Sequence, residues 1–137
     1  MGQRTVRVGL VLADPRYSTA IAVGAHQLRA DEPIEVGGGD TGPAPKEWLL
    51  SALGACTAIT LRMYAERKQW PLQSVRIELD YGESSPGRTV IVRKLHIEGD
   101  LDEAQRERLL QIANACPVHK ILTGAIEIPT ELSPATE

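Results

Sequence analysis

One stretch of this chain is apolar on nearly every side of a helix, and it limits the folds that the chain can adopt. No charged residue lies between Glu47 and Arg62. Apolar residues along and just beyond this stretch recur at the spacing of a helical face, at Leu49, Leu53, Cys56, Ile59 and Met63. Pro45 suits the first turn of a helix. Since a helix without a polar side must be covered on several sides, we expect a long central helix that begins near Pro45 and ends before Pro71.

The uncharged part of this helix is too short to predict a membrane span. It covers only residues 48–61 and includes Ser, Thr and Gly, whereas a spanning helix needs about 20 apolar residues. The start of the sequence lacks the apolar segment of a signal peptide. We therefore expect a soluble, cytoplasmic protein without a membrane partner.

Length and composition predict one globular domain over residues 1–137. A chain of 137 residues has the usual length of a single domain. The net charge of −3 argues against a broad surface for nucleic acid or anionic lipid. Aromatic residues make up only 4% of the chain, which leaves few platforms for stacking single-stranded nucleic acid. We expect no nucleic-acid partner.

The remaining patterns predict a mixed α+β chain around the central helix. Alternating apolar residues and turn signals predict strands at residues 4–12, 19–23, 26–30, 72–81, 89–98 and 125–129. A second helix is expected over residues 101–115, with Asp100 and Glu103 resembling a capping box, and a helical turn from Pro117 to Leu122. The glycine-rich loop over residues 31–44 lacks the Gly-Lys-Ser/Thr of a phosphate loop, and Asp31 and Glu32 are expected to form a solvated turn.

Two cysteines, far apart in the sequence, are the residues best suited to chemistry. Cys56 lies in the apolar helix and Cys116 lies directly before Pro117. Cytoplasmic thiols are kept reduced, so a disulfide between them would be transient rather than structural. Both could instead be inert core residues, because free cysteine is among the most buried residue types. A redox couple requires their Cα atoms to approach to about 4.4–6.8 Å.

A reactive Cys56 needs a positive charge nearby. A free thiol has a pKa of about 8.5, and the helix dipole fades within the first turn, well before Cys56. A cation must therefore lower this pKa, and the candidates are Arg16, Arg29 and Arg62, of which Arg62 points away on the same helix. Cys116, in contrast, would lie at the N-terminal end of the following helical turn, where a thiolate is favoured.

Histidines next to these thiols allow a second interpretation, a zinc site. His119 forms a Cys-x-x-His spacing with Cys116, and His26 is another possible ligand. The two cysteines, however, lack the paired spacing typical of zinc ligands. We therefore expect no metal and no other cofactor, and we interpret the histidines as core or capping hydrogen-bonding groups.

Two motifs of the chain resemble the OsmC/Ohr family. They are GGGDTGPAPKEWLLSALGACT at residues 37–57 and ANACPVHK at residues 113–120. The segment HQLRADEP at residues 26–33 extends the resemblance, which is strongest to the less characterised OsmC-like branch. The resemblance implies an α+β fold in which a long central helix packs against antiparallel sheet, within an intertwined homodimer.

The resemblance also implies a thiol peroxidase in oxidative-stress defence. Cys56 would be the peroxidatic thiolate, which attacks an organic hydroperoxide and becomes a sulfenic acid. Cys116 would resolve it to a disulfide, and an external dithiol would restore the enzyme. The alternatives are a non-enzymatic protein that binds small molecules, and a redox sensor, on the same dimeric scaffold.

The resemblance further implies residues that activate the thiol. Peroxidases of the family place a glutamate directly after the proline at the helix start, where it holds an arginine against the thiolate. That position is Lys46 here, and Glu47 follows it. A shift by one residue turns a side chain by about 100° on a helix. Glu47 is the candidate for the glutamate role, and Arg16 or Arg29 for the arginine role.

Overall fold

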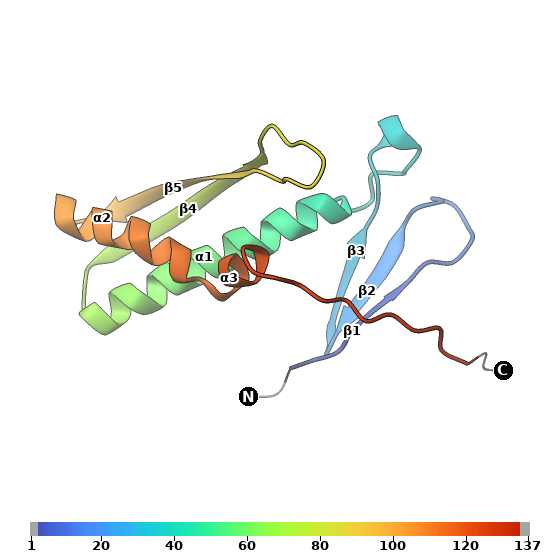
Figure 1. Ribbon diagram of the computed structural model, residues 1–137, viewed down its shortest axis with the longest axis horizontal. Helices are drawn as coiled ribbons and strands as arrows, with labels where there is room; N and C mark the ends of the chain where they lie inside the picture. Colours follow the sequence, from blue (N-terminus) through green and yellow to red (C-terminus); the bar gives the residue numbers. More distant parts are fainter. Residues whose placement is uncertain (1–2, 135–137) are drawn as a thin grey trace. The chain divides into compact units, whose positions relative to one another are not determined.

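The computed structural model describes residues 3–134, and its contacts divide them into two compact units (Figure 1). The first unit contains residues 3–52 and 79–91, and the second contains residues 53–78 and 92–134. Helix α1, Pro45–Lys68, contributes residues to both units. The expected single domain over residues 1–137 stays a prediction.

Three short strands form the sheet of the first unit. They are β1 (Val6–Gly9), β2 (Thr19–Val23) and β3 (His26–Ala30). The sheet is antiparallel in the order β1-β2-β3, and β3 leads through the 3-10 turn Ile34–Val36 towards α1. Strands β2 and β3 match their predicted ranges, whereas β1 is shorter than the predicted 4–12.

The second unit combines helices with a strand hairpin. Strands β4 (Leu72–Tyr81) and β5 (Ile91–Gly99) form a two-stranded sheet, to which both units contribute residues. They are followed by α2 (Glu103–Ile112), the 3-10 turn Ala113–Ala115 and α3 (Pro117–Leu122). The α+β fold with a long helix and antiparallel sheet is confirmed.

Leu61, Tyr64 and Leu109 form the core of the second unit. Leu61 and Leu109 have no exposed surface. Partly buried apolar side chains from both strands, from α2 and from the segments that precede β4 and α2 pack around them, namely Trp70, Leu72, Val75, Leu95, Ile97, Leu101 and Ile112. This packing places one face of α1 and one face of α2 against the hairpin.

Two local predictions are wrong. Residues 125–129 form no strand, and Ile126 and Ile128 are exposed, so an alternating apolar pattern is not sufficient without a neighbouring strand to pair with. The capping box of α2 is formed by Asp102 and Gln105 rather than by Asp100 and Glu103. Asp102 Oδ1 accepts from Gln105 N at 2.8 Å, and Gln105 Oε1 accepts from Asp102 N at 2.9 Å.

Helix α1 is longer than the uncharged stretch that the sequence argument used. Within residues 3–134 it is the one helix long and apolar enough to cross a membrane by length and composition alone. The length argument against a span is therefore insufficient. The core helix of a soluble protein satisfies the same criterion, so the absence of a membrane partner stays a prediction.

The expected solvated turn at Asp31 is wrong, because Asp31 is almost fully buried. Its carboxylate accepts from Glu32 N at 2.7 Å, Thr41 N at 3.1 Å, Thr41 Oγ1 at 2.6 Å and Gly39 N at 3.3 Å. The Thr41 hydroxyl lowers the pKa of Asp31 most, and these backbone N–H groups add to it, while burial works in the opposite direction. Gly38 lies against the carbonyl of Glu32, where a Cβ would not fit. The acidic residue thus organises the glycine-rich loop.

We expect Asp31→Asn to lower the melting temperature by several degrees at neutral pH, because the amide presents N–H groups to donors that need an acceptor. The lowered pKa means that the carboxylate stabilises the fold above the ordinary aspartate pKa of about 3.9 and loses this effect as the pH falls through the folded-state value. The difference between variant and wild type should therefore shrink in acid. Thermal unfolding across pH measures this difference.

Asp40→Asn is the matched control, because Asp40 lies in the same loop and is exposed. Its φ of 54° is a conformation that asparagine also adopts. Equal losses of stability in both variants would show that Asp31 does not organise the loop.

Candidate active site

The second unit brings the two cysteines together. Cys56 lies in the middle of α1 and is half-buried, whereas Cys116 precedes α3 and has no exposed surface. Both are free thiols, and each shifts the pKa of the other, so they lie near one another in the fold. The two cysteine motifs, which lie far apart in the sequence, therefore meet in the fold. Only Cys56 has exposed surface through which a dissolved molecule could reach it.

Proline determines the local geometry of Cys116. Pro117 follows it, and Cys116 has an extended backbone (φ −66°, ψ 134°) as the N-cap of α3, because a residue before proline is biased away from the helical region. Its Sγ accepts from His119 N at 3.3 Å, and Thr57 Oγ1 lies 3.9 Å away. The sequence-based expectation that Cys116 begins a helical turn is confirmed.

The surroundings shift the two pKa values in opposite directions. Burial raises the pKa of Cys56, and the neighbouring Cys116 raises it further. Burial also works to raise the pKa of Cys116, but hydrogen bonds from the backbone of His119, from Cys56 and from Thr57 outweigh it, so the net pKa of Cys116 is lowered. Ionisation is thus favoured at the buried sulfur over the accessible one.

Arg93, on β5, contacts the two residues that donate to Cys116 Sγ, namely Thr57 and His119. Arg93 Nη1 donates to Thr57 Oγ1 at 3.0 Å, and its Nη2 lies 3.0 Å from Asn114 Oδ1 and 3.1 Å from His119 Nδ1. Since a guanidinium only donates, His119 Nδ1 accepts and carries no proton. Burial, followed by the charge of Arg93, lowers the pKa of His119, so His119 is neutral at neutral pH.

The sequence contained a signal for Arg93 that pattern analysis did not use. Ile91, Arg93, Leu95 and Ile97 alternate on β5, and all four are at least partly buried. An arginine at an inward position of an otherwise apolar strand face indicates a partner inside the fold. Thr57, in contrast, carries no such signal, because it is one of several small polar residues on α1.

The other predicted site residues lie in the first unit. Glu47 Oε1 accepts from Ala44 N at 2.8 Å, which caps the start of α1. Arg29 donates to Ser18 Oγ, and the Arg16 guanidinium lies 5.6 Å from the ring centroid of Tyr17. Lys46 Nζ lies over the ring of Tyr81 at 5.1 Å. The roles of Glu47, Arg16 and Arg29 at the thiol stay predictions.

Arg62, the remaining arginine candidate, lies in the second unit but is engaged elsewhere. Its Nε is 3.0 Å from Glu66 Oε2, and both side chains are largely exposed. Within the part of the chain that the structure describes, no three His, Cys, Asp or Glu side chains gather in a way that could hold a metal. The expectation of a site without a metal stays a prediction.

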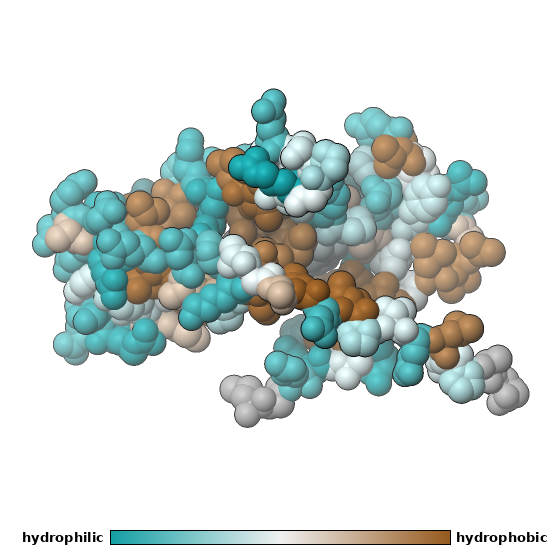
Figure 2. All heavy atoms as spheres, viewed as in Figure 1, coloured by the Kyte–Doolittle hydropathy of each residue, from teal (hydrophilic) through white to brown (hydrophobic). Residues whose placement is uncertain are grey.

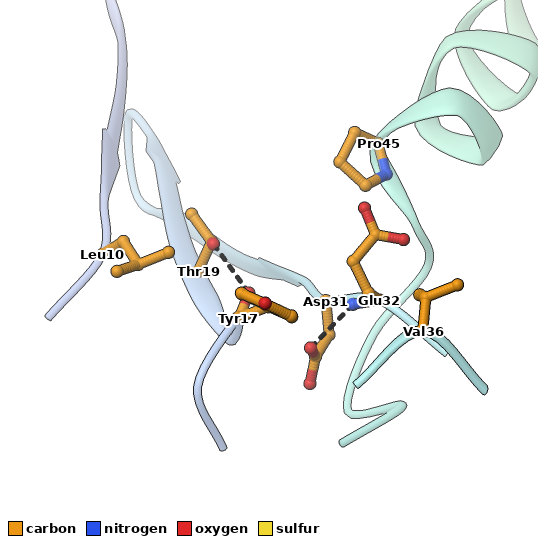
Figure 3. A pocket seen from close by; sticks show the side chains of 7 residues that line it. All are labelled: Leu10, Tyr17, Thr19, Asp31, Glu32, Val36 and Pro45. Carbon is orange, nitrogen blue, oxygen red and sulfur yellow. Dashed lines mark hydrogen bonds between the residues drawn. The ribbon is translucent and has the colours of Figure 1, made fainter. Parts of the chain in front are cut away.

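The first unit contains a cleft of about 580 Å³ that the sequence did not indicate (Figure 3). It is lined by Leu10, Tyr17, Thr19, Asp31, Glu32, Val36 and Pro45. Figure 3 shows the Glu32 carboxylate pointing towards Pro45, whereas the Asp31 carboxylate points away from it. Because Asp31 is occupied by the loop, Glu32 is the carboxylate available to a molecule in this cleft.

Fold and thiol pair together define the class of protein, an α+β protein with a paired-cysteine site. The model of the OsmC-like protein family matches residues 37–131, which include both cysteines. The chain therefore belongs to the OsmC-like family.

Solved structures agree with this assignment. The OsmC-like protein of Mycoplasma pneumoniae has a TM-score of 0.74 at 21% identity, with 90% of this chain and 89% of that chain covered. The organic hydroperoxide resistance protein OsmC of Legionella pneumophila has a TM-score of 0.66 at 19% identity, over 90% and 91% of the two chains. The organic hydroperoxide resistance protein OhrB of Bacillus subtilis has a TM-score of 0.63 at 20% identity, over 90% and 92%.

At these identities the structural likeness establishes the fold. No match was found among curated protein sequences.

Proposed function

We propose that the protein is a cytoplasmic thiol peroxidase that reduces organic hydroperoxides with an external dithiol. The observation that carries this proposal is the pair of neighbouring free thiols, one accessible and one buried. Relatives of the same fold that are named for organic hydroperoxide resistance support it. No resident cofactor takes part in the proposed reaction.

The proposed cycle needs three balanced steps. Cys56 gives up its proton and attacks the distal peroxide oxygen as a thiolate, the O–O bond breaks, and the leaving alkoxide takes a proton to become the alcohol. Cys116 then attacks the sulfur of the Cys56 sulfenic acid, which forms the disulfide and releases water. Finally, the dithiol reduces this disulfide by two exchange steps and is itself oxidised to a disulfide.

Peroxide consumption by the wild-type protein tests this proposal. We expect catalytic consumption of tert-butyl or cumene hydroperoxide with dihydrolipoamide as reductant. One disulfide per chain should form when the reductant is left out, with a mass loss of two hydrogens. Failure to consume peroxide, together with a free Cys56 thiol under excess oxidant, would contradict it.

A second candidate is a protein that senses oxidants or binds small molecules without turnover. The raised pKa of the accessible Cys56 and the open cleft of the first unit favour this candidate. A sensor would form the disulfide stoichiometrically but cycle slowly. Comparing the steady-state rate with the single-turnover rate separates it from an enzyme.

We also propose that the protein forms a homodimer. Leu49, Ile59 and Met63 on α1 are about half exposed in the single chain, and Figure 2 shows hydrophobic atoms that reach the surface. A second copy that covers the apolar helix would agree with the apolar character of α1 on nearly every side. Light scattering should give twice the chain mass of 14.9 kDa.

Met63→Glu should shift this mass towards that of one chain, because the interface would bury an unpaired charge. Met63→Leu, which keeps the side chain apolar, should leave the dimer intact. A wild-type protein that is monomeric at micromolar concentration would contradict the proposal.

A further inference from the structure

One hydroxyl group joins the thiol pair to a partly buried cation. Arg93 Nη1 donates to Thr57 Oγ1 at 3.0 Å, and Thr57 Oγ1 lies 3.9 Å from Cys116 Sγ. Thr57 and Cys116 have no exposed surface. The contact between Thr57 and Cys116 therefore lies away from water, where charges act on one another most strongly.

The Thr57 hydroxyl has one proton and two possible acceptors. Leu53 O lies 2.7 Å from Oγ1 on the preceding turn of α1, and Cys116 Sγ lies on the other side at 3.9 Å. Because Arg93 donates to Oγ1, the hydroxyl must give its own proton to one of these acceptors. A neutral Cys116 leaves the proton with Leu53 O, whereas a thiolate, as the stronger acceptor, attracts it.

The charged and titratable groups that surround the thiols are few. Arg93 comes from β5 and His119 from α3, and Cys56 and Cys116 themselves come from α1 and the start of α3. His119 accepts at Nδ1 and is neutral, so within the described part of this cluster Arg93 carries the positive charge.

We propose that Arg93 is a positioning residue that acts through Thr57 to hold the single negative charge of the thiol pair on Cys116. The Cys116 thiolate then serves as the base for Cys56. As Cys56 Sγ attacks the distal oxygen of a peroxide, its proton passes to Cys116 Sγ and the O–O bond breaks. The negative charge leaves on the alkoxide, which takes a proton from water to become the alcohol. The proton transfer from Cys56 to Cys116 during the attack rests on the proposed peroxidase function, whereas the ionisation of the thiol pair does not.

The experiment is a titration of the thiol pair in the full-length reduced protein, followed by ultraviolet thiolate absorbance. We expect Arg93→Met to raise the midpoint of the first ionisation by about one pH unit, which makes the thiolate about tenfold rarer at neutral pH. Thr57→Val should have a similar effect, since it removes the hydroxyl and leaves Arg93 in contact with His119. Arg93→Lys and Thr57→Ser, which keep the donor groups, should restore most of the wild-type midpoint.

Two further variants complete the design. Lys94→Met removes an exposed charge from the neighbouring position on β5 and should leave the midpoint unchanged. The double variant Arg93→Met/Thr57→Val should shift the midpoint no further than Thr57→Val alone, because the two residues act in series.

The possible outcomes separate clearly. An unchanged midpoint in Arg93→Met and Thr57→Val, with circular dichroism that matches the wild type, would overturn the proposal. Additive shifts in the double variant would overturn the part in which Arg93 acts through Thr57. If Arg93→Met does not fold, then Thr57→Val and Arg93→Lys decide the question. A shifted midpoint in a protein whose wild type consumes no peroxide would refute the peroxidase and leave this inference standing.

Discussion

Replacing Cys56 with serine should reduce hydroperoxide consumption by at least about a thousandfold, because the variant loses the nucleophile of the proposed cycle. Cys56 is the thiol of the pair with exposed surface, whereas Cys116 has none. A serine hydroxyl does not form the anion that attacks a peroxide oxygen under these conditions, since the thiolate is the reactive species of cysteine. Peroxide consumption with a dithiol, measured beside wild type, gives the rate.

Ala55→Ser provides the control for Cys56→Ser. It introduces the same hydroxyl at the adjacent, exposed position of α1 and should retain wild-type activity. If Cys56→Ser keeps a rate within tenfold of wild type while remaining folded, Cys56 is not the attacking thiol.

Replacing Cys116 with serine should separate the first oxidation from the rest of the cycle. Cys56 can still become a sulfenic acid, but no buried thiol remains to convert it to a disulfide. Steady-state turnover should fall by about a hundredfold, the size of effect expected when a positioned proton acceptor is removed. Trapping with dimedone, followed by mass spectrometry, should find the adduct on Cys56.

The pH dependence of Cys116→Ser supplies a second measurement. Burial raises the pKa of Cys56, so most Cys56 is protonated at neutral pH, and its oxidation rate should rise as the pH increases through this range. With a single cysteine left, this variant cannot form an intramolecular disulfide. A variant that keeps wild-type turnover would therefore show that Cys116 does not resolve the sulfenic acid.

Local patterns in the sequence predicted most of the elements that position the site. The apolar spacing along α1 and the proline at its start determine a helix from Pro45, because helix formation depends on neighbouring residues. The same applies to Cys116, whose extended backbone follows from Pro117. The motifs around the two cysteines also indicated the OsmC/Ohr family, which the match to residues 37–131 confirms.

Predictions that depended on pairing between distant segments were less successful. Residues 125–129 alternate as a strand does but have no strand partner in the structure. Asp31 has the composition of an exposed turn, yet donors from residues 39–41 surround its carboxylate. The missing strand at residues 125–129 and the burial of Asp31 both depend on segments farther along the chain, so local sequence patterns do not reveal them.

The sequence by itself determined that each thiol lies on a helical element, one in the middle of α1 and one before α3. Only the tertiary structure decided that the pKa values of the two thiols shift in opposite directions. Arg93 is 36 positions from Thr57, and Thr57 is 59 positions from Cys116. The pKa of a thiol depends on burial and on donors within a few ångströms. Folding, rather than proximity in sequence, brings those donors to Cys116 and leaves the accessible Cys56 protonated.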